Sequence, residues 1–257
     1  MPKTNLTIDR LREVKTTNQI LAILVVILAL SLGVTVGKQK SWLKNRLPEV
    51  ADARLFTEGT ISLDKPNLTL ARNLNQTIKA RKTRWQFNPT PLEKAKLSQL
   101  LWAMQGITTD WGDRAVPTSR EAYPLQVSVM IQRSTDVPAG LYLYDPGTHS
   151  LKTMQNFDPA KAGALFGSIP SLQQAGAILI ISANTASLAE KYDQQDKPEL
   201  AYLEAGHAAQ NLMLEAEALG LGVNAITQFD DILPAYFQIP ESEITIYLLP
   251  VGYPKEE

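Results

Sequence analysis

The chain has 257 residues, enough for one domain with a substantial core and some additional segments. Its formal net charge of -1 at pH 7 provides no overall electrostatic attraction to nucleic acid. It contains no cysteine, which excludes disulfides, a thiolate nucleophile and cysteine-ligated zinc or iron–sulfur sites. Its two histidines, His149 and His207, are far apart in sequence, which argues against a histidine-rich metal site.

The N-terminal quarter is divided by an aliphatic run. Residues 1–19 are polar with mixed charge, residues 20–36 are almost purely aliphatic and uncharged, and residues 37–56 form a basic and then polar linker. A run of this kind predicts a single transmembrane helix, with a cleaved signal peptide as the alternative. Lys and Arg are equally frequent on its two sides, so the positive-inside rule does not orient the span.

Residues 57–257 form the predicted folded domain, with recognisable periodic elements from Asn73 onwards. Helix and strand patterns mix without regular βαβ alternation, which indicates an α+β fold with a mostly antiparallel sheet. Helices are expected over residues 92–104, weakly over 158–169, over 185–192 and over 230–237. Strands are expected over residues 127–131, 141–144, 177–181, 223–226 and 244–251, and the uninterrupted apolar run of 177–181 is typical of a strand buried on both faces.

The stretch 204–223 predicts a central helix that ends at Gly220, where glycine favours a left-handed cap. Five residues at helical spacing form its expected core stripe: Leu200, Leu203, Ala208, Leu212 and Leu219. Polar Gln210 and Asn211 lie among alanines and a glycine, so the helix is either a plain core helix or one that a flat ligand or second chain approaches closely.

Three further stretches are candidates for chemistry. Residues 79–84 place cations beside a hydroxyl, which suits a phosphate monoester, although such a run is more often a solvated segment. Residues 114–124 form a loop with small hydroxyl residues, which either faces a polar heterocycle or is a turn fixed by prolines. Residues 225–231 lead from a buried strand into a helix, where free backbone N–H groups face a ligand or Asp230 simply caps the helix.

In this order, the stretches resemble the nitroreductase-like FMN flavoproteins, specifically their SagB-type dehydrogenase branch. The resemblance covers roughly residues 60–254 and is sharpest over residues 97–108, 139–146, 203–212 and 246–254. It implies a homodimer with FMN at the subunit interface, hydride transfer through flavin N5, and NAD(P)H as an electron donor. Since FMN is made in the cytosol, it also favours a cytoplasmic orientation of the domain.

The resemblance also assigns roles to particular residues. Arg81, Lys82 and Thr83, with Arg84, would hold the FMN phosphate. Pro117, Thr118 and Ser119 match the loop beside the isoalloxazine, and Gln210 and Asn211 match a helix segment near the flavin and the second subunit. Thr227 and Gln228 match the pair whose backbone N–H groups face the flavin. The chain departs from the family pattern at Trp85, where an arginine is expected, and at Gln228, where glycine is frequent.

Three functions fit this pattern. The first is a membrane-anchored FMN oxidoreductase with an unidentified substrate. The second is a dehydrogenase of the same fold that acts on azolines in a modified peptide, for which a Lys-Tyr pair is proposed to assist proton removal. Lys191-Tyr192 is the one adjacent Lys-Tyr pair in the sequence, and a surface helix end is its alternative role. The third is a non-catalytic, membrane-tethered dimeric scaffold.

Overall fold

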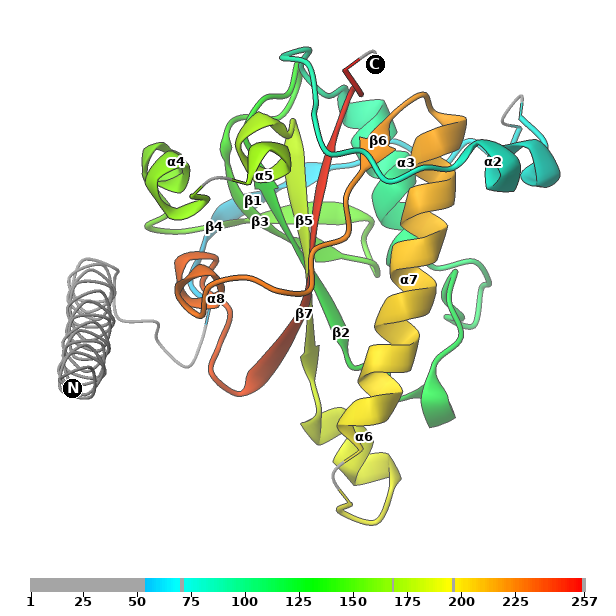
Figure 1. The fold of residues 1–257 in the computed structure, drawn as a ribbon. Coiled ribbons are helices and arrows are strands. Elements are labelled where there is room, and N and C mark those ends of the chain that lie inside the picture. The colour runs from blue at the N-terminus through cyan, green and yellow to red at the C-terminus, as the bar shows by residue number, and fades with distance from the viewer. Residues whose placement is uncertain (1–53, 70–71, 168, 196, 256–257) are drawn as a thin grey trace, which may run out of the picture. The chain divides into compact units, whose positions relative to one another are not determined.

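The structure is a computed structural model that describes residues 54–69, 72–167, 169–195 and 197–255. In this part of the chain a seven-stranded sheet has the strand order β1-β4-β3-β2-β5-β7-β6, and all neighbouring strands are antiparallel (Figure 1). This confirms the predicted α+β fold with a mostly antiparallel sheet. The strands are β1 (Phe56–Ser62), β2 (Leu125–Ile131), β3 (Gly140–Asp145), β4 (Ser150–Met154), β5 (Ala177–Asn184), β6 (Gly222–Val223) and β7 (Glu243–Gly252).

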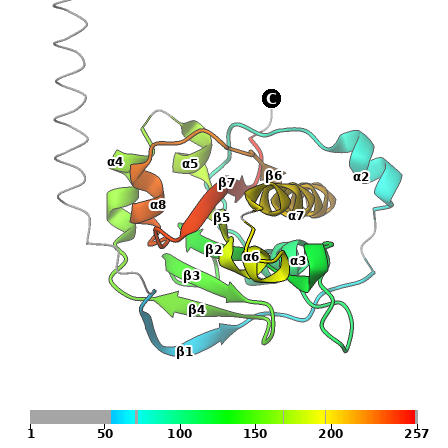
Figure 2. The ribbon, with the colours of Figure 1, turned by 90° about the horizontal axis from the view of Figure 1, so that it is seen from below.

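Helices cover both faces of this sheet. Figure 2 shows α3, α6 and α7 on one face and α4, α5 and α8 on the other, with α2 beyond α7. The helices are α2 (Leu74–Ala80), α3 (Lys94–Gln105), α4 (Ala162–Leu165), α5 (Pro170–Gln174), α6 (Ala186–Lys191), α7 (Pro198–Ala218) and α8 (Ile232–Tyr236), with short 3-10 turns at Ser119–Glu121 and Pro159–Lys161. The weak helical pattern of residues 158–169 therefore corresponds to a 3-10 turn followed by one turn of α-helix.

The core is built around β5, which lies between β2 and β7. Its residues from Ala177 to Ala183 are all buried, as their uninterrupted apolar sequence predicts for a strand covered on both faces. Ile181 is paired with Val127 of β2, and Ile180 is paired with Leu248 of β7. Burial of these side chains from both helical layers supplies the main hydrophobic stabilisation of the sheet.

Helix α7 has 21 residues and packs its small side chains inward. Ala205, Ala208 and Ala209 are buried, so the helix lies close against α3 and the sheet. The helix ends as predicted, because Gly220 adopts the left-handed conformation (φ 73°) and the N–H of Leu221 bonds the carbonyl of Ala216 at 2.8 Å. The predicted core stripe is wrong at Leu203, whose side chain lies on the outer face and is 61% exposed.

Strand β1 is an element that the sequence pattern did not reveal. It precedes Asn73, where the first periodic element was expected, and pairs with β4 through Ile61 and Leu151. A bulge interrupts the pairing near Gly59, which has a φ of 94°. As an edge strand, β1 is mostly exposed, so its sequence lacks the hydrophobic alternation by which a half-buried strand is recognised.

The predicted membrane localisation requires correction. Within the described ranges, no helix combines the length and the apolar character that crossing a bilayer requires, and this finding contradicts the predicted single-pass localisation. The aliphatic run of residues 20–36, on which that prediction depended, lies outside the described residues. The linker of residues 37–56 is also outside them, apart from its last three positions.

Candidate functional site

The basic segment predicted to bind a phosphate is held between β6 and the C-terminal residues. The N–H of Arg84 donates to the carbonyl of Val223 at 3.0 Å, and Thr83 forms a parallel β-bridge with the same residue. Further along, the N–H of Asn88 donates to the carbonyl of Tyr253 at 2.9 Å. The segment is thus fixed on both sides, at the end of the sheet where α7 also ends.

The functional groups of this segment are available to a ligand. Lys82 and Thr83 are exposed and Arg81 is partly exposed. Among the described residues, neither Arg81 nor Lys82 forms an ion pair, and the Thr83 hydroxyl makes no hydrogen bond. Two cations and a hydroxyl to which the described residues offer no partner match the acceptor oxygens of a phosphate.

Arg84 lies over the glycine that opens β6. A Cβ atom at Gly222 would lie 2.6 Å from Cγ of Arg84 and 3.2 Å from the Phe87 ring, so glycine is what permits this close packing. Trp85, which stands where the family pattern has arginine, is 65% exposed. The aliphatic stem of Arg84 is therefore the part of the segment whose position the fold defines most closely.

The chain from β6 to α8 includes Thr227 and Gln228, the pair predicted to present backbone N–H groups to a ligand. Ile226 exchanges hydrogen bonds of 3.0 Å with Leu248 of β7, which holds this connection against the sheet. The next two residues, Thr227 and Gln228, are exposed, and within the described chain their backbone N–H groups donate to no protein acceptor. Asn224 anchors the start of the connection through a buried 3.0 Å bond to the Ser171 hydroxyl.

The expected N-cap at the other end of this connection is partly present. The N–H of Ile232 donates to the Asp230 carboxylate at 3.2 Å, and Asp231 is the cap residue by backbone position. Asp230 thus shapes the entry into α8, three residues after the predicted pair of Thr227 and Gln228.

The loop of Pro117, Thr118 and Ser119 lies elsewhere, before β2. The Thr118 hydroxyl accepts a 3.0 Å bond from the N–H of Tyr123, and the Ser119 hydroxyl lies 2.5 Å from the Tyr192 hydroxyl. Positive φ angles follow at three non-glycine residues of the loop, Arg120 (47°), Glu121 (57°) and Tyr123 (45°). Such conformations are costly and concentrate at functional loops, so this is more than an ordinary turn.

The two polar residues in the middle of α7 differ in their surroundings. The Asn211 amide donates to the carbonyls of Ala103 at 3.2 Å and Ala115 at 3.1 Å, which ties α7 to the end of α3 and to the loop that follows. Gln210 is exposed on the outer face of the helix. Asn211 is therefore a structural link, while Gln210 remains free to contact another molecule.

A buried carboxylate supports the 117–119 loop from within α7. Glu204 is only 3% exposed; burial raises its pKa, and the nearby side chains of Thr118, Gln105 and Arg114 oppose that rise. Arg114 donates to Gln105 at 2.7 Å and lies over the Tyr123 ring at 4.5 Å. This buried carboxyl group therefore lies where the loop packs against α7, and its Oε1 atom has no hydrogen-bond partner among the described residues.

Apart from Gln210 and Asn211 in the middle of α7, the predicted site residues lie towards opposite ends of this helix. Arg81, Lys82, Thr83 and Arg84 lie beside β6, beyond the C-terminal end of the helix, whereas the 117–119 loop contacts Tyr192 of the α6 end, before its N-terminal end. Figure 1 shows β6 and α6 at these two ends. A helix of 21 residues is roughly 30 Å long, so one chain does not bring the two groups together.

Comparison with known proteins agrees with this fold. The family model described as "Nitroreductase family" matches residues 78–253. The chain belongs to the nitroreductase family. A relative from Methanocaldococcus jannaschii, itself described provisionally as a nitroreductase, is 30% identical over 199 residues, which cover 75% of this chain and 96% of that protein.

Solved structures show the same nitroreductase fold. A provisionally assigned nitroreductase from Ralstonia eutropha JMP134 has a TM-score of 0.62 at 25% identity and covers 80% of this chain and 96% of its own. A chain of the E. coli microcin synthetase McbBCD complex has a TM-score of 0.60 at 18% identity, covering 79% of both chains. The NADPH:FMN oxidoreductase of Vibrio harveyi, complexed with NAD+, has a TM-score of 0.51 at 16% identity, covering 72% and 70%.

Two residues next to the 117–119 loop could not be placed there from the sequence alone, Glu204 and Tyr192. Glu204 was treated only as part of a helical run, although an acidic residue among alanines on a buried helix face is a signal that it has a specific role. Tyr192 could not be placed at a site, yet it contacts Ser119, and Arg120 stacks over its ring at 4.2 Å. Only the folded chain brings the end of α6 to this loop.

Proposed function

We propose that this nitroreductase-family protein is an FMN-dependent oxidoreductase of the SagB-type dehydrogenase branch, acting on a substrate still to be identified. The observation that carries the proposal is the pairing of two features on one sheet edge. Arg81 and Lys82, which form no ion pair with the described residues, lie beside β6. The backbone N–H groups of Thr227 and Gln228, which have no acceptor in the described chain, follow β6 by a few residues. Members of this family usually bind FMN, and this edge offers the groups that such a ligand needs.

The residues fit FMN. Arg81, Lys82, Thr83 and Arg84 would hold the phosphate by charge-assisted hydrogen bonds, and the N–H groups of Thr227 and Gln228 would face the polar edge of the isoalloxazine. When bound, FMN supplies hydride acceptance and donation at N5. The chain's own part is to orient the ring, since Asn224 and the Ile226–Leu248 pair hold the connection that presents the two N–H groups.

A second copy of the chain would complete the site. The loop of Pro117, Thr118 and Ser119 lies too far along α7 to reach the flavin of its own chain, so in our proposal it serves the flavin held by the other copy. The outer face of α7 supports this arrangement, because Tyr202 is 49% and Leu203 61% exposed. Exposed large apolar side chains around a polar Gln210 are typical of an interface.

Flavin retention by the full chain tests the cofactor. Purified protein is saturated with FMN and passed through a desalting column, and a retained flavin absorbance is expected. Arg81→Ala should raise the Kd for FMN by about ten-fold or more, because a charge-assisted bond contributes roughly 1.5–3 kcal/mol. Lys65→Ala, which removes an exposed cation between β1 and α2 and outside residues 79–84, is the matched control and should leave the Kd unchanged.

Two outcomes would contradict these assignments. A colourless protein that takes up no FMN would favour a non-catalytic dimeric scaffold over an enzyme. Retained FMN with an unchanged Kd in Arg81→Ala would refute the phosphate assignment alone. Bleaching of the bound flavin by NADH or NADPH would support a nicotinamide donor, in keeping with the NAD(P)H use typical of the family.

The dimer has its own test. Light scattering after gel filtration should give twice the chain mass, and Leu203→Glu should shift the protein towards the monomer by burying a charge in the proposed interface. Leu55→Glu, which places the same charge at an exposed leucine just before the edge strand β1, is the control. A dimer of unchanged strength in Leu203→Glu would show that this face is not the interface.

The azoline dehydrogenase is a second candidate, favoured by one contact. The hydroxyl groups of Tyr192 and Ser119 lie 2.5 Å apart, so the Lys191-Tyr192 pair stands beside the loop proposed to face the isoalloxazine. Tyr192→Phe should abolish oxidation of an azoline-containing peptide while leaving flavin reduction by NAD(P)H intact. Equal loss of both activities would instead indicate that Tyr192 merely supports the loop.

A further inference from the structure

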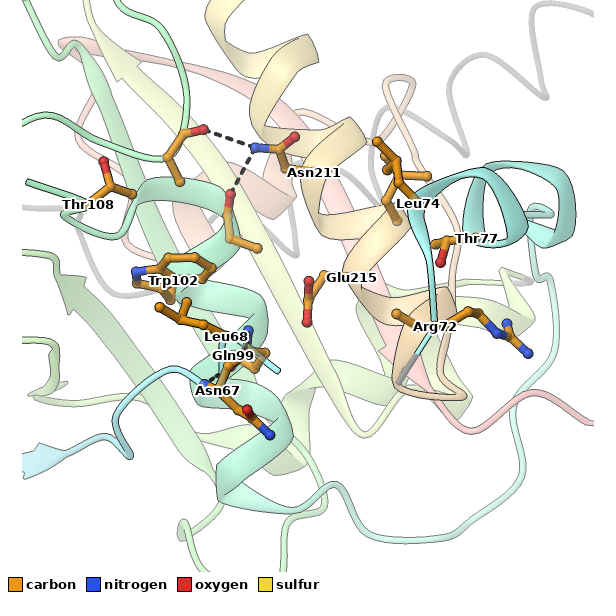
Figure 3. A pocket seen from close by; sticks show the side chains of 14 residues that line it. Asn67, Leu68, Arg72, Leu74, Thr77, Gln99, Trp102, Thr108, Asn211 and Glu215 are labelled. Carbon is orange, nitrogen blue, oxygen red and sulfur yellow. Dashed lines mark hydrogen bonds between the residues drawn. The ribbon is translucent and has the colours of Figure 1, made fainter. Parts of the chain in front are cut away.

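A cavity of about 500 Å³ lies between α2, α3 and α7 (Figure 3). Of the residues assigned above to FMN, only Asn211 lines it, and the Asn211 amide is already bonded to two backbone carbonyls. We propose that this cavity binds a small organic ammonium ion with an apolar body, as a site separate from the proposed flavin site. Its volume lies within the range of about 300–1,000 Å³ that is usual for small-molecule sites.

Glu215 gives the cavity its negative charge. Its side chain points into the cavity from α7, and its Oε1 atom is buried without a hydrogen-bond partner in the described part of the protein (Figure 3). Burial raises the pKa of Glu215, which shows that its charged form is poorly solvated. A buried carboxylate oxygen without a donor is costly, and an ammonium group would supply both the donor and the opposite charge.

Other lining residues compensate this charge only in part, because the Gln99 side chain opposes the rise in the pKa of Glu215 but no lining cation pairs with it. Arg72 is the only cation among the described lining residues, and it pairs with Glu217 at 2.9 Å instead. The Gln99 amide is engaged with the backbone of Asn67, accepting from its N–H at 2.8 Å and donating to its carbonyl at 3.2 Å. The Oε1 atom of Glu215 is therefore the part of the carboxylate left for a ligand.

The remaining walls favour an organic cation over a metal ion. Trp102, Leu68, Leu74 and Leu214 provide apolar surface, and an indole ring attracts a cation that lies over its face. Leu68 and Leu74 are exposed, and they gain burial if a ligand covers them. A metal ion would need several oxygen ligands, whereas Glu215 is the only carboxylate on the described lining. No group of three side chains that could hold a metal ion occurs among the described residues.

Calorimetric titration of the full chain with 2-phenylethylammonium chloride at pH 8 tests the proposal without any activity assay. Saturable binding is expected, together with at least ten-fold weaker binding of neutral 2-phenylethanol, which has the same apolar body. Glu215→Gln should weaken amine binding at least ten-fold. Glu199→Gln removes an exposed carboxylate from the same helix and should bind as the wild type does.

A second variant keeps the test decisive if Glu215→Gln folds poorly. Leu74→Lys changes an exposed position on the rim and brings a tethered ammonium to Glu215, so it should abolish amine binding while melting like the wild type. Absence of binding at amine concentrations up to about 10 mM would overturn the proposal. Equal affinity for the amine and the alcohol would overturn it as well. Displacement of the amine by FMN would also overturn it, because the cavity would then belong to the flavin site.

Discussion

Replacing Gly222 by alanine should disturb the basic segment through a single added methyl group. That methyl would lie 2.6 Å from Cγ and 2.8 Å from Cβ of Arg84, far inside van der Waals contact. Arg84 cannot retreat freely, because its N–H is bonded to the carbonyl of Val223 at 3.0 Å. Overpacking of this kind costs about 1–3 kcal/mol of the free energy of unfolding.

For a domain of this size each kcal/mol corresponds to roughly 2–4 °C, so the Tm of Gly222→Ala should fall by about 2–12 °C. The same variant should bind FMN more weakly, since Arg84 is a proposed phosphate contact. Thermal unfolding followed by circular dichroism, with and without FMN, measures both effects.

Gly163→Ala is the matched control for the added methyl group. Gly163 lies in α4, has no heavy atom within 4 Å of the position that a Cβ would take, and should gain about 0.5–1 kcal/mol from the better helix propensity of alanine. If Gly222→Ala melts like the wild type and binds FMN equally well, the packing of Arg84 on Gly222 does not position the segment.

Two further predictions concern polar contacts away from the flavin edge. Arg54 donates two hydrogen bonds, of 2.8 and 2.7 Å, to the carboxylate of Glu243 in a buried pair. Glu243→Gln should therefore lower the free energy of unfolding, measured by urea titration, by about 3–5 kcal/mol. A loss below about 1 kcal/mol would refute the importance of the pair. The two ring nitrogens of His149 each lie 2.8 Å from a hydroxyl oxygen, Nε2 from Ser98 and Nδ1 from Tyr144, and burial lowers the pKa of the ring. The stability that the neutral ring contributes is therefore fully present above the ordinary imidazole pKa of about 6.5 and is lost as the pH falls below that value. The urea midpoint of the wild type should therefore fall between pH 7.5 and 5.5 more steeply than that of His149→Gln, and parallel curves would refute this account.

The elements with a clear burial pattern could be predicted from sequence. Strand β5 is apolar throughout and buried on both faces, and α7 ends at Gly220 because a left-handed cap favours glycine. Strand β6 is shorter than the predicted strand of residues 223–226, since only Gly222 and Val223 pair continuously with β7. Beyond Val223 the pairing is interrupted, since Ala225 is exposed and Ile226 returns to β7 only through an isolated bridge to Leu248.

Local contacts in the candidate site were less predictable because they join segments far apart in sequence. Tyr192 meets Ser119 across 73 residues, and no local pattern encodes that contact. Leu203 was expected in the core because its spacing fits the stripe, but helical spacing alone does not say which of two apolar faces turns inward. The buried alanines of α7 decide the question, since small side chains allow the closest approach to α3.

Strand β1 limits how the protein can be shortened for experiments. It covers the backbone N–H and C=O groups of β4, and the Gln155 amide donates to the carbonyl of Phe56 at 2.6 Å. A chain that began at Asn73, where the first periodic element was expected, would leave β4 as a bare edge that other chains can extend. One that began after Arg54 would keep β1 but lose the ion-pair partner of Glu243. Aggregation of the shorter chain alone would therefore report an opened sheet edge rather than an intrinsically unstable domain.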